Sequence, residues 1–104
     1  ARCARILREH GYSVEDATNG IEAIDRYRAR RPDAVLLNVT MPVMDGLAAL
    51  REIRRLDPTA RVAMVSANGQ QRVVIEAFQH GARDFILKPF QPERLIEAVQ
   101  RLLQ

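Results

Sequence analysis

Three short, continuous apolar runs constrain the fold of this chain more than any other feature of its sequence. The runs cover residues 34–37, 62–65 and 85–87, and within them apolar residues do not alternate with polar ones. Runs of this kind are typical of strands that are buried on both faces, as in parallel sheets covered by helices on both sides. The sequence therefore predicts an α/β fold built around parallel strands.

The segments between and after these runs have the spacing of amphipathic helices. Their apolar stripes are Leu47, Leu50 and Ile53; Val74, Ala77 and Phe78; and Leu95, Ile96, Val99, Leu102 and Leu103. Pro92 precedes the last stripe, and proline suits the first turn of a helix. Alternation of strand and helix predicts right-handed crossovers, with helices on both faces of the sheet.

The N-terminal part of the chain predicts a helix, a strand and a second helix. Cys3, Ile6, Leu7 and His10 share one face of a predicted helix that Gly11 caps. The charged, alternating residues 12–16 predict an edge strand. Asn19-Gly20 turns the chain into the second helix, which Pro32 ends. The expected order thus begins with a helix that no strand precedes.

Composition and charge narrow the class of protein. A chain of 104 residues with 47% hydrophobic and 28% charged residues is typical of one globular domain, which we expect to span residues 1–104. No apolar run is long enough for a membrane span or a signal-peptide core, so we expect a cytoplasmic protein without membrane partners. Cys3 is the only cysteine, and we interpret it as a small core residue.

A polar residue follows each of the three buried runs. These residues are Asn38, Ser66 and Lys88. Ligands of open parallel sheets bind beyond the carboxyl ends of the strands, where these side chains are expected to meet. A carboxamide, a hydroxyl and an ammonium group together predict an oxyanion site, although strand ends are also polar simply because the chain reaches the surface there.

These residues belong to longer stretches that resemble the receiver domain of two-component response regulators. The resemblance rests on PDAVLLNVTMPVMDGLAALREIR, VAMVSA and GARDFILKPF, and the N-terminal ILREHGYSVEDATNGIEAI is similar to the corresponding part of a receiver. It implies a flavodoxin-like fold with strand order 2-1-3-4-5. It also implies phosphoryl transfer from a histidine kinase or phosphotransfer protein to an aspartate at the end of the third strand. Magnesium would be held by that aspartate, by an acidic pair after the first strand and by one backbone carbonyl.

Carried over position by position, the resemblance assigns a role to each residue of the expected site. The acceptor position is Asn38, the carbonyl ligand is that of Thr40, the switch hydroxyl is Ser66, the phosphate-contacting cation is Lys88, and the aromatic switch position is Phe85. The Lys88–Pro89 bond corresponds to one that is cis in receivers, so we expect a cis peptide bond at Pro89. Because Phe85 lacks the hydroxyl of tyrosine, we expect it to behave as a core residue.

Two departures from the family pattern argue against phosphate acceptance. An amide carries no negative charge and its nitrogen lone pair is delocalised, so Asn38 cannot form an acyl phosphate. The acidic pair is also missing, and no other carboxylate replaces it: we expect Asp45 to cap the following helix, and Asp16 corresponds to an edge-strand position. We therefore expect no magnesium in this form of the domain.

The expected fold lacks its first strand, which in the family lies between the second and third. Without it, a gap of about 9–10 Å, twice the usual strand spacing, would separate the strands that contain Val14 and Val35. Their edges would pair with each other, with another chain, or not at all. We interpret the chain as a truncated or altered receiver.

We therefore expect a non-enzymatic receiver that acts as a signalling or protein-interaction module. The helix at 72–80, the strand at Phe85 and the last helix would form its partner surface, with a homodimer as one option. The alternative is a small basic nucleic-acid-binding α/β domain, suggested by the net charge of +3, although the arginines are scattered and the aromatic residues few. An enzyme using Ser66 with Lys88 would lack an oxyanion hole and a third orienting residue.

Overall fold

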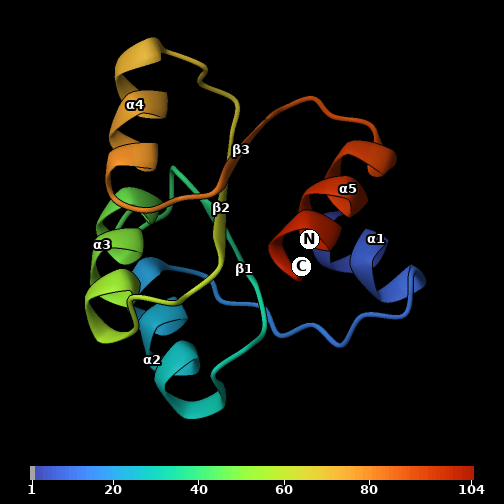
Figure 1. Cartoon of the computed structure of the whole chain (residues 1–104), viewed down its shortest axis with the longest axis horizontal. Helices are drawn as coiled ribbons and strands as arrows, with labels where there is room; N and C mark the ends of the chain where they lie inside the picture. Colours follow the sequence, from blue (N-terminus) through green and yellow to red (C-terminus); the bar gives the residue numbers. More distant parts are fainter. Residues whose placement is uncertain (1) are drawn as a thin grey trace.

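A three-stranded parallel sheet separates two groups of helices in the computed structural model (Figure 1), which describes residues 2–104. The strands are β1 (Val35–Asn38), β2 (Val62–Ser66) and β3 (Asp84–Leu87), and they lie side by side in the order β1-β2-β3. All neighbours are parallel, with Val35 opposite Val62 and Ala63 opposite Asp84. The strands predicted from the three apolar runs are thus confirmed.

Within residues 2–104, five helices cover the two faces of the sheet. Helices α1 (Arg2–Glu9) and α5 (Pro92–Leu102) lie on one face, and α2 (Gly20–Arg30), α3 (Gly46–Leu56) and α4 (Gln71–Gln79) lie on the other (Figure 1). Every residue of β2 is buried, because this central strand contacts both groups of helices. Its Met64 belongs to the core beside α2 and α3, whereas Val65 belongs to the core beside α1 and α5.

The predicted edge strand at residues 12–16 is wrong. This segment has no regular secondary structure, and it crosses from α1 on one face to α2 on the other (Figure 1). A strand exists only through hydrogen bonds to a neighbouring strand, and the described sheet begins at β1. Residues 2–104 therefore contain no counterpart of the first strand of the order 2-1-3-4-5. In place of the second strand of that order they have the connection at residues 12–16.

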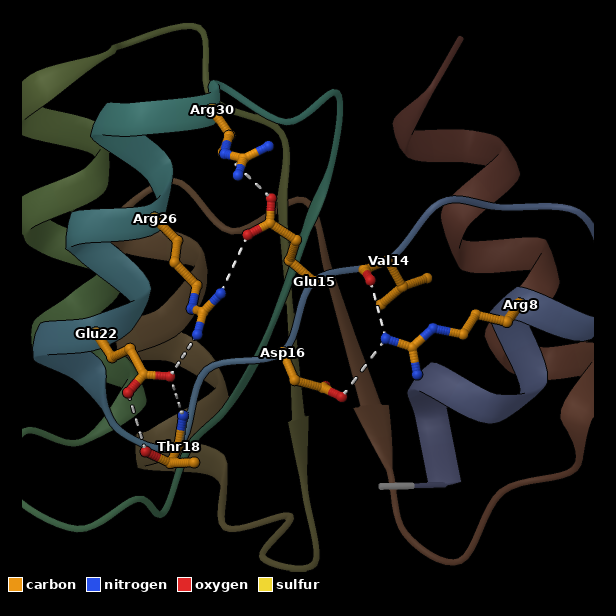
Figure 2. Close-up of polar contacts among 8 residues, drawn as sticks. All are labelled: Arg8, Val14, Glu15, Asp16, Thr18, Glu22, Arg26 and Arg30. Atoms are coloured by element: carbon orange, nitrogen blue, oxygen red, sulfur yellow. Dashed lines mark hydrogen bonds and ion pairs between the residues drawn. The ribbon is translucent and has the colours of Figure 1, made fainter.

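Side chains from both flanking helices hold this connection in place (Figure 2). Arg8 of α1 donates a hydrogen bond of 2.9 Å to the carbonyl oxygen of Val14. Glu15 accepts a hydrogen bond of 3.1 Å from Arg26 and lies 3.5 Å from Arg30, both on α2. Tyr12 and Val14 also pack against the core beside α1 and α5, so the alternating apolar residues are used in packing although no neighbouring strand pairs with the segment.

Within residues 2–104, no helix combines the length and the apolar character required to cross a membrane.

Candidate functional site

The three polar residues that follow the apolar runs lie at one edge of the sheet. Asn38 ends β1 and Ser66 ends β2, while Lys88 comes directly after β3. The register places Asn38 opposite Val65, and the backbone N–H of Lys88 donates a hydrogen bond of 2.9 Å to the carbonyl oxygen of Ser66. Asn38 and Lys88 are exposed and Ser66 is buried. The sheet therefore presents an amide and an ammonium group on a common rim.

The loop that follows β1 closes tightly against the end of that strand. The N–H of Gly46 donates to the carbonyl oxygen of Val39 at 2.8 Å. A side-chain carbon on Gly46 would lie 1.9 Å from the carbonyl oxygen of Asn38, which is impossible without moving the backbone. Position 46 must therefore be glycine for this loop to fold back over the rim.

Asp45 and Thr40 take different places in this loop. Asp45 accepts a hydrogen bond of 2.9 Å from the N–H of Ala48 and is the N-cap of α3, a helix-capping arrangement in which the carboxylate satisfies a free backbone donor. Thr40 is exposed in the loop. Asp45 is thus the only carboxylate among Asn38, Thr40 and Asp45, and it is used to cap α3.

Ser66 positions the loop between β2 and α4. Its hydroxyl oxygen accepts a hydrogen bond of 2.9 Å from the N–H of Asn68, and residues 67–70 are all exposed. A hydroxyl can accept through one lone pair and still donate its proton, so Ser66 keeps one donor for a ligand at the rim.

The β3 end of the site is fixed by its neighbours. Phe85 is half-buried against the core beside α3 and lies opposite Met64 in the sheet. The Lys88–Pro89 peptide bond is cis. One residue before Phe85, Asp84 accepts two hydrogen bonds of 2.9 and 3.0 Å from the guanidinium of Arg94 on α5. This paired hydrogen bond holds the pKa of Asp84 below its ordinary value.

Sequence reasoning missed the Asp84–Arg94 pair and the close approach of Gly46. The sequence does contain a signal for the Asp84–Arg94 pair. An acidic residue at the start of a strand and a basic residue in the following helix lie near each other when the connection between them is short. The second has a weaker signal, the Asp-Gly pair that precedes an apolar stripe. Neither pattern distinguishes a buried contact from an ordinary turn or surface pair.

The residues at the rim do not fit a magnesium site. Magnesium prefers carboxylate and water oxygens in octahedral geometry, whereas the rim offers an amide, a hydroxyl and backbone carbonyls. Asp45 is engaged in capping, and Asp16 lies 4.0 Å from Arg8. Among residues 2–104, no group of three histidine, cysteine, aspartate or glutamate side chains is arranged to hold a metal ion.

Cys3 has the environment of a core residue and not that of a nucleophile. Its side chain is half-buried and packs against the core between α1 and α5. Burial raises the pKa of the thiol, which keeps it in the less reactive protonated form.

A parallel sheet covered by helices on both faces, with polar residues at the carboxyl ends of its strands, defines a doubly wound α/β domain. The family model for the response regulator receiver domain matches residues 1–100. The chain belongs to this family, and its fold is the flavodoxin-like α/β fold of CheY-like receivers.

Individual relatives cover nearly all of the chain. It is 48% identical over 98 residues to the chemotaxis protein CheY of Thermotoga maritima, a match that covers 93% of this chain and 82% of that protein. It is also 48% identical over 99 residues to CheY of Bacillus subtilis, covering 94% of this chain and 82% of the relative.

Solved structures show the same fold. The receiver domain of NtrX from Brucella abortus superposes with a TM-score of 0.92 at 35% identity, covering 98% of this chain and 87% of that one. The CheX–CheY–BeF3–Mg complex of Borrelia burgdorferi gives a TM-score of 0.92 at 34% identity, covering 99% of this chain and 79% of that one.

Proposed function

We propose that this chain is a receiver domain that does not accept phosphate and acts as a signalling or protein-interaction module of a two-component system. The observation that carries the proposal is Asn38 at the carboxyl end of β1, on the same rim as Ser66 and Lys88. The rim keeps a cation and a hydroxyl that suit an oxyanion, but its acceptor side chain is an amide.

The chemistry of Asn38 supports this proposal. Phosphoryl transfer to a side chain needs a nucleophilic atom with an available lone pair. The amide nitrogen shares its lone pair with the carbonyl, and the amide oxygen has no formal charge. The domain is therefore proposed to have no enzymatic or phosphate-accepting activity and to work without magnesium.

The proposed partners are a histidine kinase, a phosphotransfer protein or a second copy of the domain. Three large apolar side chains on α4 and β3 support a protein contact: Ile75, Phe78 and Leu87 are 45%, 46% and 50% exposed. They belong to two of the elements, α4 and β3, that form the partner surface predicted from the sequence; the third element, α5, lies on the other face of the sheet (Figure 1). Large apolar side chains that are exposed on neighbouring elements support a protein contact through α4 and β3.

The proposal is tested by adding beryllium fluoride with magnesium and, separately, acetyl phosphate. We expect no saturable binding by calorimetry and no hydroxylamine-sensitive phosphoprotein by mass spectrometry. CheY of Borrelia burgdorferi, whose solved complex contains BeF3 and magnesium, is the positive control for the fluoride assay. Saturable fluoride binding or a phosphorylated side chain in this chain would contradict the proposal.

The variant Asn38→Asp separates the acceptor from the metal ligands. If the amide alone prevents phosphate acceptance, this variant gains a phosphoprotein signal. If the acidic ligands are also required, the variant remains unlabelled at ordinary magnesium concentrations. Both results leave the wild-type expectation intact, and the comparison measures what Asn38 contributes.

The nucleic-acid alternative receives little support from the arrangement of charges. Within residues 2–104, nine arginines lie within 4.0 Å of a carboxylate oxygen; these are Arg8, Arg26, Arg28, Arg30, Arg31, Arg51, Arg55, Arg94 and Arg101. Neutralised and dispersed cations do not form the continuous basic surface that phosphate backbones require.

A further inference from the structure

The chain has three asparagines, and the structure places them in very different environments. Asn19 and Asn68 are each followed by glycine, whereas Asn38 is followed by Val39. An asparagine side chain is attacked by the backbone nitrogen of the next residue when that nitrogen is accessible and unhindered. Glycine permits this attack because it has no side chain to block the approach. The sequence alone therefore makes Asn19 and Asn68 equivalent.

The structure distinguishes them through the hydrogen bonding and burial of the attacking nitrogen. Asn68 and Gly69 are exposed and lie outside regular secondary structure. Within residues 2–104, the N–H of Gly69 donates no hydrogen bond. The side-chain oxygen of Asn68 accepts a hydrogen bond of 2.9 Å from the N–H of Gln70, as that of Asn19 does from Glu22, so the difference between the two sites lies in the attacking nitrogen.

The attacking nitrogen of the Asn19-Gly20 pair has the opposite environment. Gly20 is the buried first residue of α2, and its N–H donates a hydrogen bond of 3.0 Å to the carbonyl oxygen of Met44. The side-chain oxygen of Asn19 is held by the N–H of Glu22 at 2.9 Å as the cap of the helix. Attack at this pair would require the helix start to open and the hydrogen bond to Met44 to break.

We propose that Asn68 is a site of spontaneous deamidation that places a new carboxylate at the rim of the receiver site. The nitrogen of Gly69 loses its proton to solvent base and forms a bond to the side-chain carbon of Asn68. The bond from that carbon to the amide nitrogen breaks, and ammonia leaves after taking a proton from water. The product is a five-membered succinimide.

Water then opens this ring at either of its two carbonyl groups. Breaking the newly formed bond gives an ordinary aspartate at position 68. Breaking the original peptide bond instead gives isoaspartate, in which the main chain runs through the former side chain and is one carbon longer. Water is the only co-reactant, and no oxidation or reduction takes place.

The position of Asn68 gives this modification a consequence for the rim. Its N–H is bonded to the hydroxyl of Ser66, and a side-chain carbon on Gly69 would lie 2.9 Å from a terminal carbon of Leu87. The loop thus lies against the ends of β2 and β3. Deamidation adds one negative charge here, reducing the formal net charge from +3 by one unit. The isoaspartate form also lengthens the connection to α4.

Asn38 is protected from deamidation, so this reaction does not place an aspartate at the acceptor position. Its following residue, Val39, is branched, and the N–H of Val39 donates a hydrogen bond of 2.9 Å to the carbonyl oxygen of Val65. The attacking atom is therefore both hindered and engaged in the sheet. The new charge therefore arises mainly at position 68 and not at the acceptor position.

Incubation of the folded chain at mildly alkaline pH, followed by peptide mapping, tests the proposal. We expect the amide-to-acid mass change and isoaspartate at position 68, with conversion at position 19 slower by about tenfold or more, since a hydrogen bond and local opening add to its barrier. Equal conversion at the two positions, or faster conversion at position 19, would overturn the proposal.

Two controls separate structural protection from the sequence itself. In urea the two Asn-Gly pairs should convert at similar rates; if they differ as much as in the folded chain, the argument from structure fails. The variant Gly69→Ala should slow conversion at position 68, with circular dichroism checking its fold. Should alanine disturb the loop by crowding Leu87, Asn68→Gln leaves Gly69 in place and should also slow conversion, because attack would have to close a larger ring; unchanged conversion in a folded variant contradicts the mechanism.

Discussion

Val43, in the loop between β1 and α3, has a backbone conformation that its side chain disfavours. Its φ is 67°, in the left-handed region, and its side chain is 83% exposed. A branched side chain crowds the backbone in this region, and burial provides little compensation here. The loop geometry, fixed at Gly46, therefore imposes strain on this residue.

Replacing Val43 with glycine should stabilise the domain. We expect Val43→Gly to raise the free energy of unfolding by about 1 kcal/mol, because the relief of strain exceeds the added flexibility of the unfolded chain. Urea denaturation measures the change. Thr40→Gly, in the same loop but without a positive φ, should lower stability; an equal gain at both positions would contradict the explanation.

Residue patterns predicted which side chains lie at the rim, but they did not predict the backbone strain at Val43. Asn38, Ser66 and Lys88 were accessible to prediction because each follows an apolar run, and parallel strands place their ends together. The φ of Val43 was not accessible to prediction, since valine itself gives no signal for a left-handed conformation. It results from the fold of the loop around Gly46, which depends on contacts with another part of the chain.

At the scale of elements, a buried tyrosine joins the C-terminal ends of α2 and α3. The hydroxyl of Tyr27 donates a hydrogen bond of 2.7 Å to Asp57, and Arg31 lies 3.2 Å from the same carboxylate. Asp57 also accepts hydrogen bonds from Thr59. These donors hold the pKa of Asp57 below its ordinary value, while burial raises the pKa of Tyr27.

Removing the Tyr27 hydroxyl should weaken the contact between α2 and α3 without creating a cavity. We expect Tyr27→Phe to lower the free energy of unfolding by about 0.5–1.5 kcal/mol, the net value of one hydrogen bond. Tyr12→Phe is the matched control, because the half-buried Tyr12 hydroxyl makes no hydrogen bond to any other residue of the described range 2–104. Equal losses in the two variants would show that the hydrogen bond is not the cause.

The helices and the three strands were predictable because their apolar spacing is local. Residues 12–16 were not, since alternation describes a segment suited to a strand but does not provide its neighbour. The side chains of Arg8 and Arg26 instead contact this connection. Charged contacts between distant positions leave no periodic pattern, so their effect on the fold appears only in three dimensions.

At the scale of the whole molecule, Asp84 and Arg94 link the sheet to α5. The pair is partly shielded, with side chains 21% and 36% exposed. Because Arg94 lowers the pKa of Asp84 in the folded state, the ionised form of Asp84 favours folding. This stabilisation is complete above the unfolded-state pKa, near 3.9, and is lost as the pH falls through the lower folded-state pKa.

The variant Asp84→Asn should therefore cost stability at neutral pH but not in strong acid. We expect a loss of about 1 kcal/mol near neutrality, allowing for screening of partly exposed charges, and a difference from wild type that shrinks toward zero below the folded-state pKa. Urea denaturation across the pH range measures it. Asp25→Asn, which removes a 3.5 Å surface pair with Arg28, should change little; a constant difference at all pH values for Asp84→Asn would contradict the linkage.

The contact between Gly46 and the end of β1 also bears on how such a domain can evolve. The loop is held by main-chain atoms: the N–H of Gly46 binds the carbonyl of Val39, and its α-carbon faces the carbonyl of Asn38. Neither contact depends on which side chain occupies position 38. The contacts that close this loop are therefore available with either asparagine or aspartate at position 38, so the side chain there can change while the main-chain frame of the rim is kept.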